Sequence, residues 1–291
     1  MKHAILILAH KDFDQLRHLI EYFIKDCFVY VHIDKKAVIT SEELHSIGSM
    51  PQVRAVYQKF DIHWGGFSML QAELWLVEKA YNDLHHDYYH LISGQDYPIK
   101  TFHYFEDFFE KQKGISFIEY QPLPVNDWSQ NEQWRYRYIL PFDRIYTHTT
   151  SHAKVIKWWK HQVKNNFVRI LPSHFTHLYK GSQWFSLTRQ AVDVLLAFTQ
   201  NNPNFLRCFK NTYAPEETYV TTILANLLPK ASQKNDNLRF IIWRSENGSY
   251  PAILGVEHSD ALQQSPSLFA RKMSIPFSAP LIRKIDAIIY E

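Results

Sequence analysis

The first hundred residues alternate between short apolar runs and segments with helical periodicity, and this alternation constrains the fold more than any other feature. Apolar runs at residues 3–9, 28–33, 53–57 and 88–92 have the length and continuity of buried strands. Over residues 16–24 and 67–81, apolar residues recur at steps of three and four, as on one face of a helix. The pattern predicts an α/β fold with a mostly parallel central sheet, whose ligands bind at the carboxyl ends of the strands.

The rest of the chain resumes this pattern after an irregular segment. Residues 119–146 are rich in aromatic residues, proline and arginine and have no clear period. Further elements are predicted at residues 152–170 (helix), 183–187 (strand), 189–198 (helix) and 215–228 (helix). No linker, low-complexity run or internal repeat divides the chain, so we expect one continuous domain over residues 1–291.

Glycine is scarce, which excludes the common phosphate-binding loops. The chain has 8 glycines in 291 residues, and only Gly65 and Gly66 are adjacent, so neither G-x-x-x-x-G-K-[ST] nor G-x-G-x-x-G occurs. The net charge of +3 is small for a nucleic-acid-binding protein. The 2 cysteines form no C-x-x-C pair and the 16 histidines no H-E-x-x-H motif, so no zinc site is expected.

The expected location follows from the apolar runs and the cysteines. No run approaches the roughly 18 residues of a membrane span, and two cysteines without a disulfide framework fit a reducing compartment. We expect a soluble cytoplasmic protein. The helix predicted over residues 152–170 has a basic face beside Trp158 and Trp159, formed by Lys154, Lys157, Lys160 and Lys164. We interpret it first as a solvated surface; the alternative is a peripheral contact with the inner face of the cell membrane.

Polar residues at the predicted strand ends are candidates for ligand binding. His10, Asp34 and Asp96 each follow an apolar run. Because parallel strands end at one edge of a sheet, these side chains would lie where an α/β protein binds its ligand. Polar residues also end strands without any function, and for a single residue we weigh the two interpretations equally.

The sequence Pro215-Glu216-Glu217 is the best candidate for a general base. Proline favours a first helical turn, where carboxylates are stabilised by unpaired amides and by the helix dipole. An ionised carboxylate that points away from a helix start suits proton abstraction. The alternative, which the pattern alone favours, is an ordinary acidic helix start.

No metal site is expected. Asp12-x-Asp14 has the spacing of a metal-binding acidic pair, but it begins the first predicted helix, so we interpret it as a helix cap. Asp96 is a single acid, which makes a poor Mg²⁺ site. Arg271 and Lys272 could instead offset the charge of a departing diphosphate, because lysine and arginine both bind phosphate oxygens. The alternative is a basic pair on the surface.

Seven segments in order together resemble the core-2/I-branching β-1,6-N-acetylglucosaminyltransferase and peptide O-xylosyltransferase family (glycosyltransferase family 14), in its bacterial form. They are residues 7–11 (ILAHK), 31–35 (VHIDK), 64–68 (WGGFS), 90–99 (HLISGQDYPI), 181–185 (GSQWF), 215–217 (PEE) and 269–272 (FARK). The resemblance covers nearly the whole chain. It implies a Rossmann-like GT-A fold that inverts the anomeric centre of a UDP-sugar without metal, with residues 1–100 as the nucleotide-binding half and 101–291 as the acceptor and catalytic half.

The resemblance also assigns roles. It implies that Glu217 is the base, Glu216 its acidic neighbour, Lys272 a diphosphate ligand and Asp34 a uridine contact. Members of the branching group have a second basic residue before the FARK segment, where this chain has none, so Arg271 or Arg244 would have to replace it. The donor is left open between UDP-GlcNAc and UDP-xylose.

The acceptor is expected to be a hydroxyl of a glycan or of a lipid-linked saccharide. Glu119 is a candidate acceptor contact, and Trp134 and Trp184 are candidates for stacking on sugar rings. Two alternatives are xylosyl transfer to a protein hydroxyl and a non-catalytic module that binds saccharides or membranes. A glycoside hydrolase is less favoured, because it needs two opposed carboxylates, and Glu216 and Glu217 are adjacent in sequence.

Overall fold

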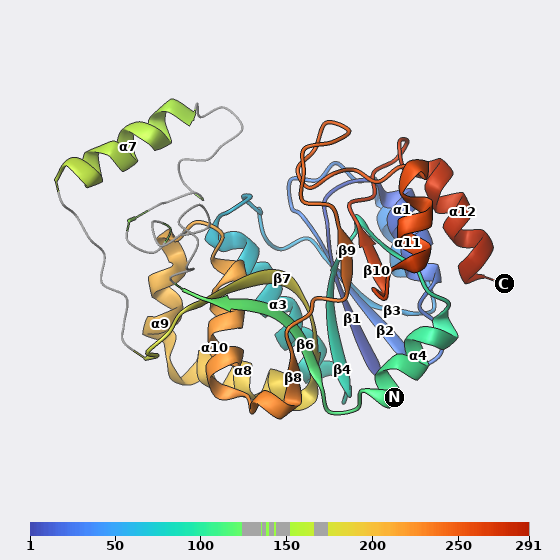
Figure 1. The fold of residues 1–291 in the computed structure, drawn as a ribbon, viewed down its shortest axis with the longest axis horizontal. Helices are drawn as coiled ribbons and strands as arrows, with labels where there is room; N and C mark the ends of the chain where they lie inside the picture. The colour runs from blue at the N-terminus through green and yellow to red at the C-terminus, as the bar shows by residue number, and fades with distance from the viewer. Residues whose placement is uncertain (124–134, 136–137, 140–142, 144–151, 166–173, 291) are drawn as a thin grey trace.

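A central sheet of seven strands, counted over the described residues, runs through the molecule (Figure 1). The structure, a computed structural model, describes residues 1–123, 135, 138, 139, 143, 152–165 and 174–290. The strand order is β3-β2-β1-β4-β7-β6-β8. The bounds are β1 (His3–Ala9), β2 (Cys27–Ile33), β3 (Val53–Tyr57), β4 (Tyr88–Ser93), β6 (Ser116–Pro122), β7 (Tyr179–Thr188) and β8 (Gln233–Lys234).

The first four strands are parallel and end together. Ala9 of β1 pairs with Ile33 of β2, and Leu8 pairs with Ser93 of β4, so the register aligns their carboxyl ends at one edge. Both β1 and β4 are buried along their whole length, which explains their continuous apolar sequence. β7 runs antiparallel to β4 and β6, so the sheet is mixed but mostly parallel.

A smaller sheet stands at this carboxyl edge. Its order is β5-β10-β9, with β5 (Asp96–Pro98), β9 (Arg239–Ile241) and β10 (Phe269–Arg271). β5 begins three residues after Ser93, the last residue of β4, and Asp96 pairs with Arg271 of β10. The FARK segment, near the end of the chain, is thereby held beside the strand ends of the first hundred residues.

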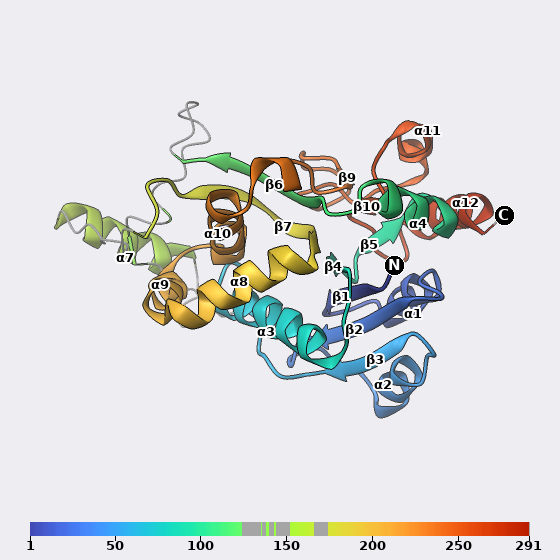
Figure 2. The same ribbon diagram turned by 90° about the horizontal axis from the view of Figure 1, so that it is seen from below.

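Helices cover both faces of the central sheet, as Figures 1 and 2 show together. One apolar core contains residues of α3 (Phe67–Asp83), α8 (Arg189–Asn201), α9 (Pro203–Cys208) and α10 (Tyr219–Leu227). The opposite core contains residues of α1 (Phe13–Glu21), α2 (Ser41–Gly48), α4 (Phe102–Lys111), α11 (Ser259–Gln264) and α12 (Ala279–Ile289). β1 serves both cores, because Ile5 and Ile7 face one and Leu6 and Leu8 the other.

One helix lies at the end of the molecule away from α4 and α12. α7 (His152–Lys164) is joined to other described residues through the backbone of Ile139 (Figures 1 and 2). The Trp158 indole donates to the Ile139 carbonyl at 2.9 Å, and the Gln162 amide donates to the same oxygen at 2.8 Å. Among the described helices, none combines the length and the apolar character required to span a bilayer.

The α/β class with a mostly parallel sheet is confirmed, and each predicted strand and helix has a counterpart. Two boundary predictions are wrong, and the first concerns the segment that begins at Pro215, which is two elements. Pro215–Glu217 forms a 3₁₀ turn, and α10 begins only at Tyr219, because Thr218 leaves the helical conformation with a ψ of −38° at a φ of −127°. The second concerns the irregular segment predicted over residues 119–146: residues 119–122 belong to β6, and most of the remainder lies outside the described residues.

Candidate active site

Three polar residues predicted from strand ends meet at the carboxyl edge of the sheet. His10 follows β1, Asp34 follows β2, and Asp96 lies just beyond β4. Backbone hydrogen bonds extend the pairing to this edge: the Asp34 amide donates to the Ala9 carbonyl at 2.8 Å, and the Gly94 amide to the Leu8 carbonyl at 2.9 Å. The edge therefore fixes the positions of these residues relative to one another.

Asp34 is held in one orientation at the end of β2. One carboxylate oxygen accepts hydrogen bonds from the amides of Lys36 at 3.0 Å and of Ile62 at 3.2 Å. The other oxygen lies 3.7 Å from the Lys36 ammonium. An anionic acceptor fixed in this way can recognise the N–H group of a bound ligand.

Asp96 holds a cation rather than a ligand. Its side chain is fully buried, and its Oδ1 lies 2.9 Å from Nη1 of Arg271. Its other oxygen lies 3.9 Å from Nε of the buried Arg239, whose pKa burial lowers to about 10. A carboxylate without exposed surface offers no direct contact to a ligand, so donor binding by Asp96 stays a prediction that its burial does not support. It positions Arg271, whose guanidinium stacks 4.6 Å from the Trp184 ring centroid.

Lys272, Arg271 and Lys11 form one region of positive potential. The Lys272 ammonium donates to the Ser249 hydroxyl at 3.2 Å. Burial lowers the pKa of Lys272, and the charges of Arg271 and Lys11 lower it further. The pKa of His10 is lowered first by burial and then by Lys11 and Lys272, so His10 lies in the same region. Clustered cations of this kind are suited to a ligand with several negative charges, such as a diphosphate.

The turn with the candidate base is held by the Trp64-Gly65-Gly66 segment. Ala214, which precedes the turn, has a φ of 48°, and its amide donates to the Gly65 carbonyl at 2.9 Å. Gly65 has a φ of 71°, and a Cβ atom there would lie 2.5 Å from Cε2 of Tyr213. A glycine is therefore required both by the backbone conformation and by the approach of Tyr213.

Glu217 has the geometry of an accessible carboxylate with a fixed orientation. Its Oε2 lies 2.7 Å from Nη1 of Arg135, and its side chain is 33% exposed. The Arg135 guanidinium in turn stacks 4.6 Å from the ring centroid of Tyr213. Oε1 of Glu217 accepts no hydrogen bond within the described part of the chain. One oxygen is thus anchored, which fixes the orientation of the carboxylate.

Glu216 has the opposite environment. Its side chain is buried, and Oε2 has no hydrogen-bond partner among the described residues. Burial raises the pKa of Glu216 to about 8, with a further contribution from the negative charge of Glu217. Glu216 is therefore mainly neutral at pH 7. The sequence indicated an ionised carboxylate at the start of a helix. Glu216 does not fit this expectation, because the turn is 3₁₀ and directs its side chain into the protein.

Glu119 lines a polar cavity of about 420 Å³, together with residues 235–237, Arg239, Ile241 and Trp243. Its carboxylate accepts a hydrogen bond from the Asn237 amide. Burial raises the pKa of Glu119, and the charge of Glu217 raises it further. Glu217 is therefore near enough to act on Glu119, so the cavity lies in the same region as the candidate base. Trp243 is 60% exposed and offers the ring surface that sugars stack on.

The remaining candidates have different outcomes. Trp134 lies outside the described residues. Trp184 is 9% exposed and its ring contacts Arg271, so it offers little surface to a sugar, and its stacking on a sugar stays a prediction. Arg244 is paired with Glu246 at 2.8 Å. Of Arg271 and Arg244, the two residues considered as a second diphosphate ligand, Arg271 is the one beside Lys272. Lys11, which sequence reasoning missed, belongs to the same positively charged region.

The two carboxylates of the Asp12-x-Asp14 pair have different partners. Asp14 lies 2.5 Å from Arg17, whereas Asp12 lies 3.6 Å from Lys11. Asp12 does occupy the N-cap position of α1, but with a φ of 55° and no capping hydrogen bond from its side chain. The predicted cap is thus confirmed in position, while the Asp12 side chain is turned toward Lys11 and Ser274.

One group with the composition of metal ligands occurs in the described residues, at Glu246, Glu257 and His258, with ligand atoms within 4.8 Å of one another. Its members have other partners: Arg244 pairs with Glu246, and Nδ1 of His258 accepts a hydrogen bond from the Gly255 amide at 3.1 Å.

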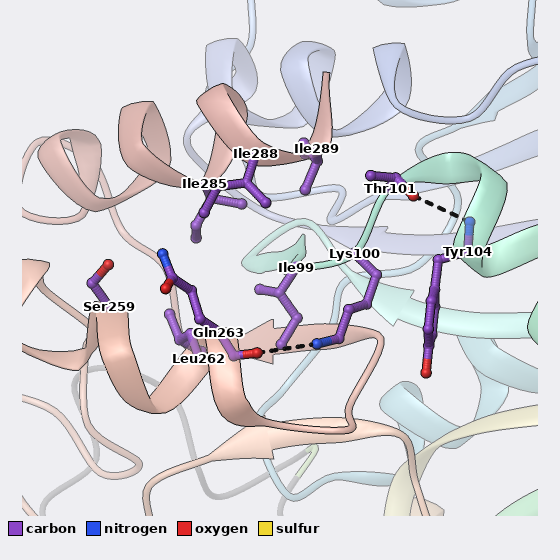
Figure 3. Close-up of a pocket in the computed structure, with 10 residues that line it drawn as sticks. All are labelled: Ile99, Lys100, Thr101, Tyr104, Ser259, Leu262, Gln263, Ile285, Ile288 and Ile289. Atoms are coloured by element: carbon purple, nitrogen blue, oxygen red, sulfur yellow. Dashed lines mark hydrogen bonds between the residues drawn. The ribbon is translucent and has the colours of Figure 1, made fainter. Parts of the chain in front are cut away.

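A second cavity, of about 430 Å³, lies between α4, α11 and α12 (Figure 3). Its wall is mostly aliphatic, and its one charged lining residue, Lys100, donates to the Gln263 carbonyl at 3.4 Å. It contains neither a carboxylate nor a cation cluster, so the strand edge is the stronger candidate for chemistry.

Sequence reasoning missed four residues of the site: Lys11, Arg135, Tyr213 and Arg239. Lys11 directly follows His10 at a predicted strand end, and this position could have indicated it. Arg135 lies in the irregular segment, where no periodicity shows which way a side chain points. Arg239 is buried under the FARK segment by long-range packing, for which the sequence has no local signal.

The chain is similar to several known glycosyltransferases. The sequence profile described as "Branch: Core-2/I-Branching enzyme" matches residues 4–263. Human xylosyltransferase 1 is 22% identical over 306 residues, which cover 98% of this chain and 30% of the relative. Xylosyltransferase oxt of Drosophila melanogaster is also 22% identical, over 90% of this chain and 30% of its own.

A human protein named as a probable β-1,3-galactosyl-O-glycosyl-glycoprotein β-1,6-N-acetylglucosaminyltransferase 7 is 25% identical, over 96% of this chain and 65% of its own. The chain spans about a third of the length of the two xylosyltransferases named above. Among solved structures, mouse xyloside xylosyltransferase 1 in its apo form aligns with a TM-score of 0.38 and 10% identity, over 94% of this chain and 99% of that one.

Proposed function

Because the chain belongs to the Core-2/I-branching enzyme family, we propose that it is an inverting, metal-independent glycosyltransferase. It would transfer GlcNAc or xylose from a UDP-sugar to a hydroxyl of a glycan or glycolipid. Its relatives bear the names of xylosyltransferases and of an N-acetylglucosaminyltransferase, so both donors are retained. We treat residues 1–291 as one domain, in which residues 1–100 supply most of the nucleotide site and residues 101–291 the acceptor and catalytic groups.

The observation that carries this proposal is the contrast between Glu217 and Glu216. Glu217 is accessible and anchored by Arg135, whereas Glu216 is buried and mainly neutral at pH 7. In the proposed reaction, Glu217 accepts the proton of the acceptor hydroxyl while that oxygen attacks the anomeric carbon opposite the UDP group, which inverts its configuration. Glu216 would support the turn and would not exchange the proton.

The proposed leaving group is UDP, and its charge would be offset by side chains. Lys272, Arg271 and Lys11 provide the positive potential that stabilises negative charge as the glycosidic bond to the diphosphate breaks. Asp34 would accept a hydrogen bond from the uracil ring, and His10 would lie beside the diphosphate, since the cations of this region act on it. With these donors in place, the reaction needs no metal ion to neutralise the diphosphate.

The acceptor is proposed to occupy the cavity of about 420 Å³ lined by Glu119. Glu119 and Asn237 can bind sugar hydroxyls, and the exposed ring of Trp243 can stack on an apolar sugar face. A second candidate function is xylosyl transfer to a protein hydroxyl. It is supported by the xylosyltransferases among the relatives, and it would use the same base and the same cations.

A peripheral membrane contact is proposed for α7. The helix presents exposed Lys157, Lys160 and Lys164 beside exposed Ile156 and Val163. Such a combination of cationic and apolar side chains suits the surface of an anionic leaflet. It would bring the enzyme to a lipid-linked acceptor at the inner face of the cell membrane.

A thermal-shift screen tests the proposed activity. UDP, UDP-GlcNAc, UDP-xylose, UDP-galactose and UDP-glucose are compared, because a ligand that binds only the folded state raises the melting temperature. We expect UDP and one of the first two sugar nucleotides to stabilise the protein, and UDP release to follow when acceptor saccharides are added. No stabilisation by UDP or by any of these donors would contradict the proposal.

A further inference from the structure

Helix α3 carries a carboxyl group in its apolar face. Glu73 is 0% exposed, and neither of its side-chain oxygens has a hydrogen-bond partner in the described part of the structure. Its neighbours on the buried face of the helix are aliphatic, among them Leu70 and Val77. An ionised carboxylate without partner or countercharge is strongly disfavoured in such a place, so the group holds a proton.

This carboxyl lies behind the turn that carries the candidate base. Both α3 and β7 contact the 3₁₀ turn Pro215–Glu217. Unpartnered buried atoms come from all three elements: both oxygens of Glu73, Oε2 of Glu216 and Nε2 of Gln183. Burial raises the pKa of Glu73, and the charge of Glu216 raises it further, against the effect of the Gln183 amide. The three side chains are thus neighbours in one enclosed polar group.

The charges around this group are few. Besides Glu73, the charged groups that act on Glu216 are Glu217, Arg135 and Asp143, and Gln183 on β7 is neutral. No cation among the described residues pairs with Glu73. Two carboxyl groups enclosed together avoid ionisation by sharing protons, and the protonated group then donates its O–H to the other.

We propose that Glu73 is a positioning residue for Glu217: as a neutral acid it donates a hydrogen bond through one buried water to the Glu216 carboxyl, and so fixes the turn from which Glu217 projects. This inference rests on the proposed function of Glu217. Arg135 fixes the side chain of Glu217, with Nη1 of Arg135 2.7 Å from Oε2 of Glu217. The Glu73–Glu216 pair would fix the backbone of the turn on its buried side. Glu73 is enclosed away from the surface, so its effect on the reaction passes through the turn.

Two substitutions of similar size separate hydrogen-bond donation from packing. Glu73→Gln keeps a neutral donor, and Glu73→Met keeps the unbranched shape without one. We expect Glu73→Gln to keep kcat within about threefold of the unmodified enzyme, and Glu73→Met to lower kcat about 10- to 100-fold, as for a catalytic group displaced by an ångström or less. KM for the UDP-sugar and stabilisation by UDP stay unchanged in both. Glu78→Gln, at an exposed position of the same helix, is the matched control.

The protonation of Glu73 has a readout that does not depend on activity. A folded-state pKa above the unfolded value near 4.5 means that the unfolded chain releases a proton that the folded chain retains, so this group lowers stability as the pH rises. In denaturant unfolding between pH 5 and 9, the unfolding free energy of Glu73→Gln minus that of the unmodified protein should become more favourable to Glu73→Gln as the pH rises. This comparison applies even if Glu73→Met fails to fold.

The outcomes are distinct. Unchanged kcat in a folded Glu73→Met variant would overturn the proposal, as would equal losses of kcat in Glu73→Gln and Glu73→Met, or a pH dependence of stability unaffected by Glu73→Gln. If the unmodified protein transfers no sugar from any UDP-sugar, the proposed function fails instead, and the pH dependence still reports whether Glu73 is protonated.

Discussion

The amide of Ala214 donates a hydrogen bond of 2.9 Å to the carbonyl of Gly65, and this bond joins two motifs that lie 149 positions apart in the sequence. Ala214 directly precedes the turn that contains Glu217, and Gly65 belongs to the loop that precedes α3. The candidate base is therefore positioned by the first half of the chain as well as by its own segment. Substitutions in the Trp64-Gly65-Gly66 segment should therefore affect catalysis through the position of the turn.

Gly65→Ala tests this link. The new methyl group would collide with Tyr213, and alanine is strained at the positive φ of this position. We therefore expect a loss of about 1–3 kcal/mol in unfolding free energy and a lower kcat. Gly114→Ala is the matched control, because Gly114 has a φ of 82° but no atom within 4 Å of the place that a Cβ would occupy. Gly114→Ala should lose stability and keep kcat. Equal kcat in the two variants would show that the loop does not position the turn.

Replacing the cations should weaken UDP binding. Hydrogen bonds to charged groups contribute about 1.5–3 kcal/mol, so Lys272→Met should raise the Kd for UDP about 10- to 100-fold, measured by calorimetry. Lys11→Met should also raise it, because Lys11 shares the positive region with Lys272. Lys113→Met, at an exposed position after α4, is the control. If Arg244→Met weakened UDP binding while Lys11→Met did not, Arg244 would be the second diphosphate ligand.

The protein should lose stability in mild acid. Burial lowers the pKa of His3 to about 3 and those of His32 and His86 to about 4. The unfolded chain binds protons at these groups below about pH 6.5, whereas the folded chain does not, so stability falls from pH 6.5 toward pH 4. One such group contributes at most about 1.4 kcal/mol per pH unit.

Two adjacent histidines isolate this effect. His86 is fully buried and His85 is exposed. We expect His86→Gln to reduce the slope of unfolding free energy between pH 6.5 and 4.5, and His85→Gln to leave it unchanged. Identical slopes for both variants would contradict the assignment of the acid sensitivity to buried neutral histidines.

The membrane contact predicts selective binding to anionic vesicles. Each lysine near such a surface contributes about 1 kcal/mol, so reversing Lys157 and Lys160 to Glu should reduce partitioning by at least tenfold in a sedimentation assay. Reversing the exposed Lys111 and Lys113, at and just after the end of α4, is the control. Binding of the unmodified protein to neutral vesicles as strongly as to anionic ones would rule out this contact.

Much of the fold was predictable from local sequence, and less of the site was. β1 and β4 are buried on both faces, so their apolar runs predicted them directly, and β3 has its predicted bounds. The direction of β7 depends on pairing with distant strands and left no local pattern. Strand ends indicated His10 and Asp34, but burial decides what such residues do. Asp96 was expected to bind the donor and Glu216 to belong to the catalytic pair, and packing encloses both.

Comparison of Glu217→Gln with Glu78→Gln tests the central claim most directly. The assay measures sugar transfer from the donor that the thermal-shift screen identifies, alongside the Kd for UDP. Loss of a general base typically costs about 10²- to 10⁴-fold in rate, so Glu217→Gln should lower kcat by that factor and leave UDP binding unchanged. Glu78→Gln should behave like the unmodified enzyme. Turnover by Glu217→Gln near that of the unmodified enzyme would contradict the role of Glu217 as the base.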